Sequence, residues 1–444
     1  MEPQTSLRRS WYVVGILTLA YISSFIDRQI LSLLVEPIKR DLKISDTEIS
    51  LLMGLSFGIF YTLLGIPIAR LADLQSRKKI IAWGVGLWSL MTAVCGMVGN
   101  FTQLFLARMG VGVGEAALSP AAYSMIADLF PKSKLPIANS VYNMGIFIGA
   151  GLAFLIGGFV VNIVNVEEMW LLPLIGEVYP WQIVFFFVGL PGILIVFLIS
   201  RIKEPVRKGI EGDKASFKQT WRYILKNANT YLNINLGLGF LTLVNYANSA
   251  WIPSFFVRTY GWTAAKAGTI YGILVITFGT LGLFFGGKLA NGFTRKGYTD
   301  ANVRAVIFLI AGVFISCWIF PLMPSGELAA LAMIPVIFFA CSPLGAGTAA
   351  IAEVTPNRMR AMASAFYLFL VNLIGLVFGP LSVALLTDKL FHDTTMIRYS
   401  LLIVMLTGSL LGVLFMYLSL NPFRKMIKKG LLQEIHANAD QEQI

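Results

Sequence analysis

The sequence predicts an all-α integral membrane protein in which twelve transmembrane helices form two pseudo-symmetric six-helix bundles. Of the 444 residues, 57% are hydrophobic and only 13% are charged, whereas about 25% of an average soluble domain is charged. The mean hydropathy is +0.74. Apolar runs of about 20 residues, the length that crosses a bilayer as a helix, recur along the chain, and loops of its first half recur in its second half. This composition excludes a soluble globular protein.

The first bundle, residues 1–202, is predicted from six apolar runs. Charged residues interrupt the interior of only the first and the fourth run, so the other four meet the simple criterion for a membrane span. The runs cover roughly residues 12–36, 48–72, 79–99, 101–127, 136–162 and 181–202.

A polar stretch, residues 203–229, follows the first bundle and is predicted to be a cytoplasmic linker. Its later part places Phe217, Trp221, Ile224 and Leu225 at helical spacing with basic residues between them. This pattern suits either an amphipathic helix on the membrane surface or a solvated linker helix.

The second bundle, residues 230–420, is predicted from six further runs, and residues 421–444 are predicted to be a cytoplasmic tail. The runs cover roughly residues 230–257, 264–290, 303–323, 328–352, 361–387 and 398–419.

Two pairs of loops show that the halves repeat one pattern. The segment from Ala69 to Lys78 (ARLADLQSRK) aligns with the segment from Gly287 to Lys296 (GKLANGFTRK). A second pair aligns DLFP, which ends at Pro131, with EVTP, which ends at Pro356. Duplicated bundles are typical of transporters that rock around a binding site at the interface of the two repeats.

The distribution of basic residues predicts the orientation of the chain. An even number of crossings puts both termini on one side, and roughly 26 Lys and Arg residues fall on that side against 7 on the other. Since basic residues accumulate in cytoplasmic loops, we expect both termini in the cytoplasm of a cell with the chain in its plasma (inner) membrane. The same bias explains the net charge of +12 without nucleic acid, because basic loops face an anionic leaflet.

The sequence offers little for catalysis or metal binding. Its two histidines are His392, in a predicted external loop, and His436, in the tail, and its three cysteines lie in apolar runs without paired spacing. Zinc sites need clustered His and Cys ligands. No pair of a nucleophile and a base stands out, so we expect no cofactor, no metal and no enzymatic activity.

Four charges interrupt the apolar runs, and such residues usually mark transport pathways. At 1.5 Å per residue, Asp27 on the first helix and Arg108 on the fourth lie at the same depth. Glu115 follows Arg108 by seven residues and therefore shares its face, as does Ser119. Together with Arg28, these residues are expected to form a network, since an isolated charge at mid-membrane costs roughly 2.5 to 3.5 kcal/mol.

Only the carboxylates of this network can change charge near neutral pH, because a guanidinium stays protonated. Asp27 and Glu115 are therefore the candidate proton carriers. Arg28, Arg108 and Ser119 are candidates for a substrate and charge network, and an anionic substrate that competes for Arg28 would couple transport to protonation. Alternatively, the charges form a static ion network that holds two helices together.

The second half supplies polar but uncharged candidates for the wall of a cavity. These are Asn245 and Asn248 on its first helix, and Tyr367 and Asn372 on its fifth. Each of them also suits a plain interhelical hydrogen bond. A cavity charged on one wall and apolar on the other fits an amphipathic substrate better than a sugar, which needs polar groups all round.

Two sets of motifs resemble a known family of transporters. Ala69, Asp73, Arg77 and Lys78 resemble the loop signature of the major facilitator superfamily, although Ser76 stands where a glycine is usual. The resemblance implies the major facilitator fold, with Asp73 and Arg77 at a cytoplasmic gate. The Spinster-like branch is indicated by three further segments: FIDRQIL from Phe25, RMGVGVGEAALSP from Arg108, and DLFP from Asp128.

The resemblance to the Spinster-like branch implies proton-coupled transport by alternating access. The implied substrates are amphipathic, lipid-like or organic-anion molecules such as lysophospholipids and sphingosine phosphates, and the implied partners are protons and the lipid bilayer. Alternatives are a multidrug exporter of hydrophobic cations, then a sugar or uronate symporter, and, outside transport, a ligand-binding membrane receptor. We expect a monomer.

Overall fold

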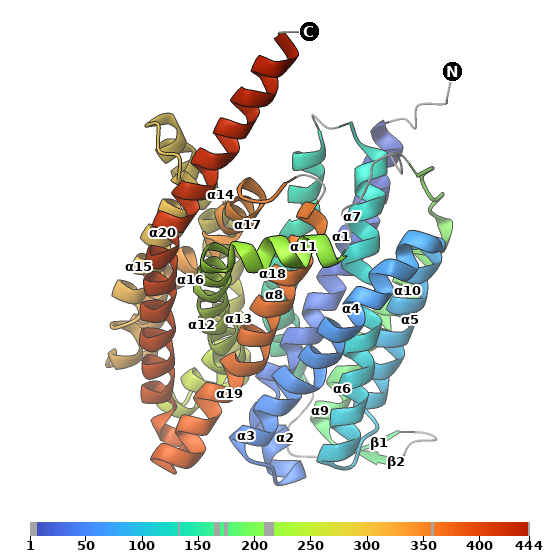
Figure 1. The fold of residues 1–444 in the computed structure, drawn as a ribbon. Coiled ribbons are helices and arrows are strands. Elements are labelled where there is room, and N and C mark those ends of the chain that lie inside the picture. The colour runs from blue at the N-terminus through green and yellow to red at the C-terminus, as the bar shows by residue number, and fades with distance from the viewer. Residues whose placement is uncertain are drawn as a thin grey trace.

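The computed structural model describes residues 7–131, 134–163, 169–172, 176–207, 217–356 and 359–442. They form a bundle of roughly parallel helices in which those of the first half, blue to green, lie on one side and most of those of the second half lie on the other (Figure 1). α1 begins and α20 ends at the same end of the bundle, called the termini end below, and the opposite end is called the far end.

The first half consists of long helices, several of them interrupted within the bundle. The chain runs through α1 (Leu7–Ile30), a 3₁₀ turn (Leu31–Leu33), α2 (Val35–Leu42), α3 (Asp46–Ser50), a π-helical turn (Leu51–Leu55), α4 (Ser56–Leu74), α5 (Arg77–Cys95), α6 (Phe101–Glu115), α7 (Leu118–Leu129), α8 (Leu135–Ile163), α9 (Pro180–Gly189) and α10 (Pro191–Arg201). A short antiparallel hairpin, β1 (Trp170–Leu172) and β2 (Gly176–Val178), precedes α9.

The second half follows a short helix, α11 (Phe217–Lys226). Its elements are α12 (Ala228–Tyr260), α13 (Ala264–Leu274), a π-helical turn (Val275–Gly279), α14 (Thr280–Arg295), α15 (Ala301–Ser316), a 3₁₀ turn (Phe320–Leu322), α16 (Gly326–Cys341), α17 (Leu344–Glu353), α18 (Arg360–Asn372), a π-helical turn (Leu373–Val377), α19 (Phe378–Leu385), another π-helical turn (Leu386–Phe391), a 3₁₀ turn (Thr394–Met396) and α20 (Ile397–Glu442).

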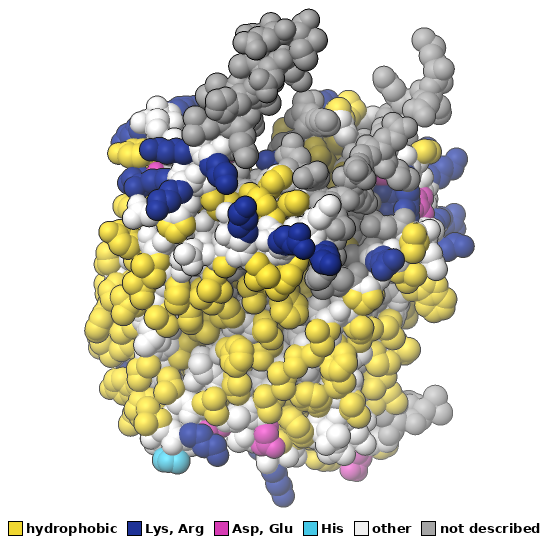
Figure 2. All heavy atoms as spheres, in the orientation of Figure 1, with side chains coloured by type: hydrophobic (Ala, Val, Ile, Leu, Met, Phe, Trp, Pro, Cys, Tyr) yellow, Lys and Arg dark blue, Asp and Glu magenta, His cyan; other side chains and the backbone are white. Residues whose placement is uncertain are grey.

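The predicted helical membrane fold is confirmed. Among the described residues, nine helices are long and apolar enough to cross a membrane. The predicted crossings at 79–99, 101–127 and 230–257 coincide with α5, with α6 and α7, and with α12. α6 and α7 have only 15 and 12 residues, because the helix is broken after Glu115, and α12 contains five asparagines. On the face shown in Figure 2, hydrophobic side chains form a broad band across the molecule, and Lys and Arg gather toward the termini end.

Glycines allow some helices to cross at backbone contact. A Cβ atom on Gly286 of α14 would lie 1.9 Å from the backbone oxygen of Ser342, between α16 and α17, and one on Gly282 would lie 2.3 Å from that of Phe338. Gly149 of α8 is similarly placed, 2.6 Å from the oxygen of Ile22 on α1. Small residues at such positions let helix backbones approach closely in membranes.

Candidate functional site

The first ion pair of the site joins Asp27 on α1 to Arg108 on α6. Arg108 Nη1 lies 3.2 Å from Asp27 Oδ1 and 3.4 Å from the backbone oxygen of the same residue. The other carboxylate oxygen of Asp27 accepts a hydrogen bond from Thr92 on α5. Asp27 is 2% exposed and Arg108 is 1% exposed. The structure thus brings together the two residues that the helix geometry predicted to lie at one depth.

The second ion pair joins Arg28 on α1 to Glu115 at the end of α6. Arg28 Nε donates to Glu115 Oε2 at 2.6 Å, and Ser24 Oγ donates to the same oxygen at 2.5 Å. Glu115 is 1% exposed, and its second oxygen, Oε1, has no hydrogen-bond partner among the described residues. Each buried carboxylate therefore has its own guanidinium partner. The four residues Asp27, Arg28, Arg108 and Glu115 are called the four-charge cluster below.

Aromatic rings surround the guanidinium of Arg28. Its Cζ lies 4.9 Å from the ring centre of Phe25, 4.5 Å from that of Phe57 and 4.6 Å from that of Tyr61. Arg108 shares the ring of Phe57 at 5.9 Å. Cations over ring faces are stabilised by the ring quadrupole, most strongly where water is excluded. The rings therefore hold Arg28 beside Glu115 in a setting where a displaced guanidinium still has favourable contacts.

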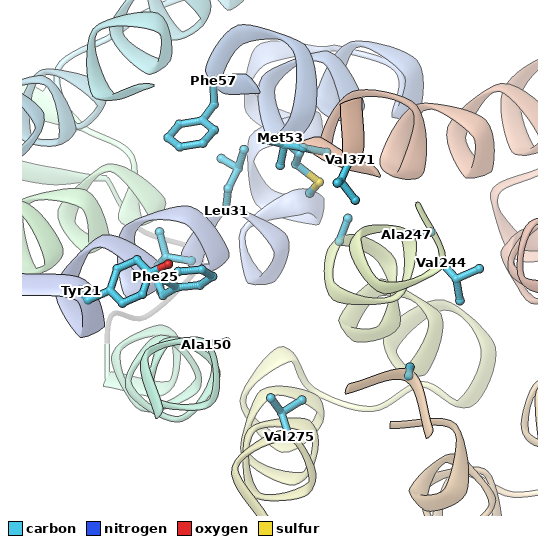
Figure 3. Packing of buried hydrophobic residues seen from close by; sticks show 14 of the residues in the cluster. Tyr21, Phe25, Leu31, Met53, Phe57, Ala150, Val244, Ala247, Val275 and Val371 are labelled. Atoms are coloured by element: carbon cyan, nitrogen blue, oxygen red, sulfur yellow. The ribbon is translucent and has the colours of Figure 1, made fainter. Parts of the chain in front are cut away.

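Arg28 also lines a small cavity between the two halves. The cavity has a volume of about 20 Å³, room for about one water molecule. Gln29, Ser32 and Phe57 of the first half line it together with residues of the second half, Tyr246, Ser249, Ala250, Leu376 and Pro380. Buried hydrophobic side chains of both halves surround this region, and Figure 3 shows Phe25 and Phe57 on one side with Val244 and Ala247 on the other.

Ser119, which was predicted to share the face of Arg108 and Glu115, lies on α7 and forms no hydrogen bond with these charges among the described residues, whereas Gly112 lies between the two charges on α6. Ser119 Oγ lies 3.3 Å from the hydroxyl of Tyr142 on α8, and that ring stacks on Tyr21 with 4.5 Å between centres. A Cβ atom on Gly112 would lie 2.6 Å from the backbone oxygen of Phe57. The space left by this glycine is thus occupied by the neighbouring helix.

The polar candidates of the second half form a looser group. Asn245 donates to the backbone oxygen of Ala340 at 3.0 Å, an interhelical hydrogen bond. Asn248 is buried, and its Oδ1 has no partner among the described residues. Tyr367 is buried and Asn372 is half-buried. Ser249 crosses to the first half, donating to Gln29 Oε1 at 2.7 Å.

Arg77, the candidate gate residue at the start of α5, is bound to α7 and to the segment that follows α10. It pairs with Asp128 of α7, and its Nη2 donates to the backbone oxygen of Pro205 at 2.8 Å. Its backbone N–H donates to Glu204 Oε1 at 2.8 Å. Burial opposes the ionisation of Glu204, but hydrogen bonds from Ser76 and Arg77 outweigh it and lower the pKa of that carboxyl. The backbone of Asp73 belongs to α4, and its side chain lies outside the described part.

A second cluster of charges joins the halves at the far end. Arg258 of α12 donates to both oxygens of Asp46 on α3, at 2.6 and 2.8 Å, and to Glu36 Oε1 of α2 at 2.7 Å. Lys39 of α2 also pairs with Asp46, which is 0% exposed. Sequence reasoning counted Lys39 and Arg258 only among the basic residues of the external side and singled out neither Glu36 nor Asp46. We call Glu36, Lys39, Asp46 and Arg258 the far-end cluster.

Comparison with known proteins assigns the chain to a family. The model of the Major Facilitator Superfamily matches residues 17–345. The chain belongs to the major facilitator superfamily. It is 29% identical over 434 residues to an MFS-type efflux pump of Mycolicibacterium smegmatis, covering 95% of each protein. It is 25% identical over 399 residues to Protein spinster of Drosophila melanogaster, covering 86% of this chain and 63% of that protein.

Solved structures point the same way. A bacterial homologue of the human lysosomal transporter Spinster, inward-facing and unoccupied, aligns with a TM-score of 0.77 and 26% identity, covering 96% of this chain and 98% of that one. Its inward-facing and occupied form aligns with a TM-score of 0.73. The predicted Spinster-like membership is therefore confirmed. This multi-pass membrane protein is a secondary transporter of the Spinster type and not an enzyme.

Proposed function

We propose that this major facilitator protein couples the movement of amphipathic, lipid-like or organic-anion substrates to protons. Asp27 and Glu115 exchange protons in this mechanism. The observation that carries it is the pairing of each buried carboxylate with its own arginine, at 3.2 Å and 2.6 Å. Protonation of Asp27 releases Arg108, and protonation of Glu115 releases Arg28, which lines the cavity between the halves.

The surroundings of Arg28 support a substrate with a charged head and an apolar body. A released guanidinium presents a planar set of donors suited to a carboxylate or phosphate. The opposite wall of the cavity offers Tyr246, Ala250, Leu376 and Pro380, which suit hydrocarbon. Asn248 and its neighbours on α12, with Tyr367 and Asn372 on α18, are candidates for further contacts.

Alternating access follows from the same arrangement. We place the termini end in the cytoplasm and the chain in the plasma membrane, since Lys and Arg gather at that end (Figure 2). Residues 1–202 and 230–420 then move as two bodies around the cavity. The far-end cluster closes the external side, which fits an inward-facing state, while Asp73 and Arg77 contribute to the cytoplasmic gate when that side closes. The protein acts as a monomer.

The decisive test is flux in proteoliposomes with an imposed pH gradient. We expect the wild type to accumulate radiolabelled lysophospholipid, and Asp27→Asn to lose gradient-driven flux while it keeps its fold and its exchange of substrate. Glu327→Gln is the matched control, because Glu327 pairs only with the exposed Lys266 in the described structure. Normal accumulation by Asp27→Asn would remove Asp27 from the coupling mechanism.

Export of hydrophobic cations is the second candidate function. Its support is the 29% identity to an MFS-type efflux pump across 95% of both proteins. Buried carboxylates such as Asp27 and Glu115 would attract a lipophilic cation. The same proteoliposomes distinguish the two proposals, since an exporter of this kind transports the lipophilic cation and does not transport lysophospholipid. Binding of either compound without any flux at saturation would instead indicate a receptor.

A further inference from the structure

A groove at the termini end is separate from the four-charge cluster. It lies where α11 ends, α12 begins and α20 passes, and it has a volume of about 390 Å³. Residues 225–230 form one wall, and Pro422, Lys425, Met426 and Lys429 of α20 form the other. The transport mechanism proposed above does not use this groove.

Three lysines line the groove without acidic partners. Lys226, Lys425 and Lys429 are all exposed, and none of them forms an ion pair within the described residues. Lys425 and Lys429 are one helical turn apart, so their side chains lie on the same face of α20. The neighbouring Arg424 points elsewhere, since its Nε binds Asp300 Oδ2 at 2.7 Å. The groove therefore concentrates positive charge that the described protein does not neutralise.

The start of α12 adds to this positive potential. α12 runs for 33 residues from Ala228, and the side chain of the preceding Asn227 does not cap it. The Asn227 amide donates instead to the backbone oxygen of Tyr223, at 2.9 Å. The N-terminus of a helix carries a partial positive charge from its backbone N–H groups. Thus the lysines and the helix terminus face the same space.

α11, which ends at the groove, is amphipathic in its exposure. The helix lies across the bundle rather than along it (Figure 1). Its inner face is buried at Ile224, and Tyr223 donates to the backbone oxygen of Val354 at 3.0 Å. Its outer face leaves Trp221 40% exposed and Leu225 56% exposed. Exposed Trp and Leu beside lysines are typical of helices that lie in the membrane interface.

We propose that this groove binds the phosphate of an anionic phospholipid from the surrounding leaflet. Lys226, Lys425 and Lys429 hold the phosphate, and the acyl chains extend past Leu225 and Met426 toward the membrane. A bound lipid of this kind bridges α11 and α20. Basic pockets at the cytoplasmic side of transmembrane helices are suited to anionic headgroups.

Native mass spectrometry of the detergent-solubilised full chain tests this proposal. We expect bound phosphatidylglycerol in preference to phosphatidylcholine. The triple variant K226Q/K425Q/K429Q should bind phosphatidylglycerol on the order of a hundredfold more weakly, since each lysine near an anionic surface contributes about fivefold in affinity. The matched control is K79Q/K288Q/K296Q, which removes three exposed lysines elsewhere at the same end and should bind as the wild type does.

Three results would overturn the proposal. One is equal binding of phosphatidylglycerol by the wild type and the groove variant. Another is equal loss in the control variant, which would indicate a general charge effect. The third is displacement of the lipid by millimolar inorganic phosphate, which would indicate an anion site without lipid selectivity. Thermal unfolding checks that the variants fold, and we expect the wild type, the groove variant and the control variant to unfold at similar temperatures.

Discussion

Loss of Arg258 should shift the protein away from the state in which the far end is closed. Arg258 joins α12 to Asp46 and Glu36 of the first half at 2.6 to 2.8 Å, so these contacts exist only while the far end is closed. Breaking a buried ion pair costs about 3 to 5 kcal/mol. Lys39 still neutralises part of the Asp46 charge. We therefore expect Arg258→Gln to destabilise the closed far end by about 2 to 3 kcal/mol, which is less than the loss of a fully buried pair.

This free energy corresponds to a change of about 30-fold to 150-fold in the ratio of the two states, since 1.4 kcal/mol is about tenfold. Spin labels on cysteines at Arg40 of α2 and Leu390 report the separation of the halves. Both positions lie near the far end, and both side chains are exposed. Pulsed electron–electron distance measurements on a background without the three native cysteines should show a longer distance for Arg258→Gln.

Lys266→Gln provides the matched comparison. Lys266 pairs with Glu327 at 2.7 Å, but both side chains are exposed and both lie in the second half. Exposed pairs of this kind are screened by water and contribute little to stability, so the distance distribution should not change. If Arg258→Gln gave the same distribution as Lys266→Gln, the far-end cluster would not control the closed state.

Three further predictions concern single contacts. Arg28→Lys should abolish transport while the fold persists, because an ammonium cannot reproduce the planar contacts of the guanidinium with Glu115 and three rings; unchanged transport kinetics would reduce Arg28 to scaffolding. Glu204→Gln should lower the free energy of unfolding at pH 7 by about 1 kcal/mol, a value reduced for solvent screening of this half-buried carboxyl. The pKa of Glu204 is lowered by folding, so its contribution is full above the unfolded pKa of about 4.3 and is lost as the pH falls through the folded pKa; an equal difference at pH 7 and at low pH would contradict this reasoning. Gly286→Ala should destabilise the protein or prevent its expression, because its Cβ would lie 1.9 Å from the backbone of Ser342. Gly287→Ala, with nothing within 4 Å of its Cβ, should be neutral or stabilising, and equal melting temperatures for the two variants would refute the packing argument.

The fold was largely predictable because a bilayer imposes a simple length and composition on each helix. The interruptions were not. The π-helical turns at Leu51–Leu55 and Leu373–Val377 face each other, and a Cβ on Gly54 would lie 2.4 Å from the backbone oxygen of Leu376. Such a turn depends on the neighbouring backbone, and the hydropathy of a sequence does not predict that contact. Cytoplasmic termini and the domain boundaries stay predictions.

The site was predictable in its members but not in its pairing. Helix geometry placed Asp27 level with Arg108, whereas the choice of Arg28 as the partner of Glu115 depends on side-chain directions. The sequence could have indicated Ser24 as a member of the site, since it precedes Arg28 by one helical turn. For Thr92 the sequence shows only a polar residue in an apolar run. Arg258 and Asp46, which are 212 residues apart, meet only after both halves have formed.

The unequal division of charge between the halves has a consequence for how the substrate preference of the protein can be changed by mutation. Within the described membrane interior, the four-charge cluster resides on α1 and α6, and the facing helices α12 and α18 contribute only neutral side chains near the midplane. Random mutagenesis confined to the uncharged positions of α12 and α18, which spares Arg258 and Arg360, can therefore reshape the surface that faces the four-charge cluster without altering a charged group. Libraries of this design should yield variants with a changed substrate preference in which the four-charge cluster is intact.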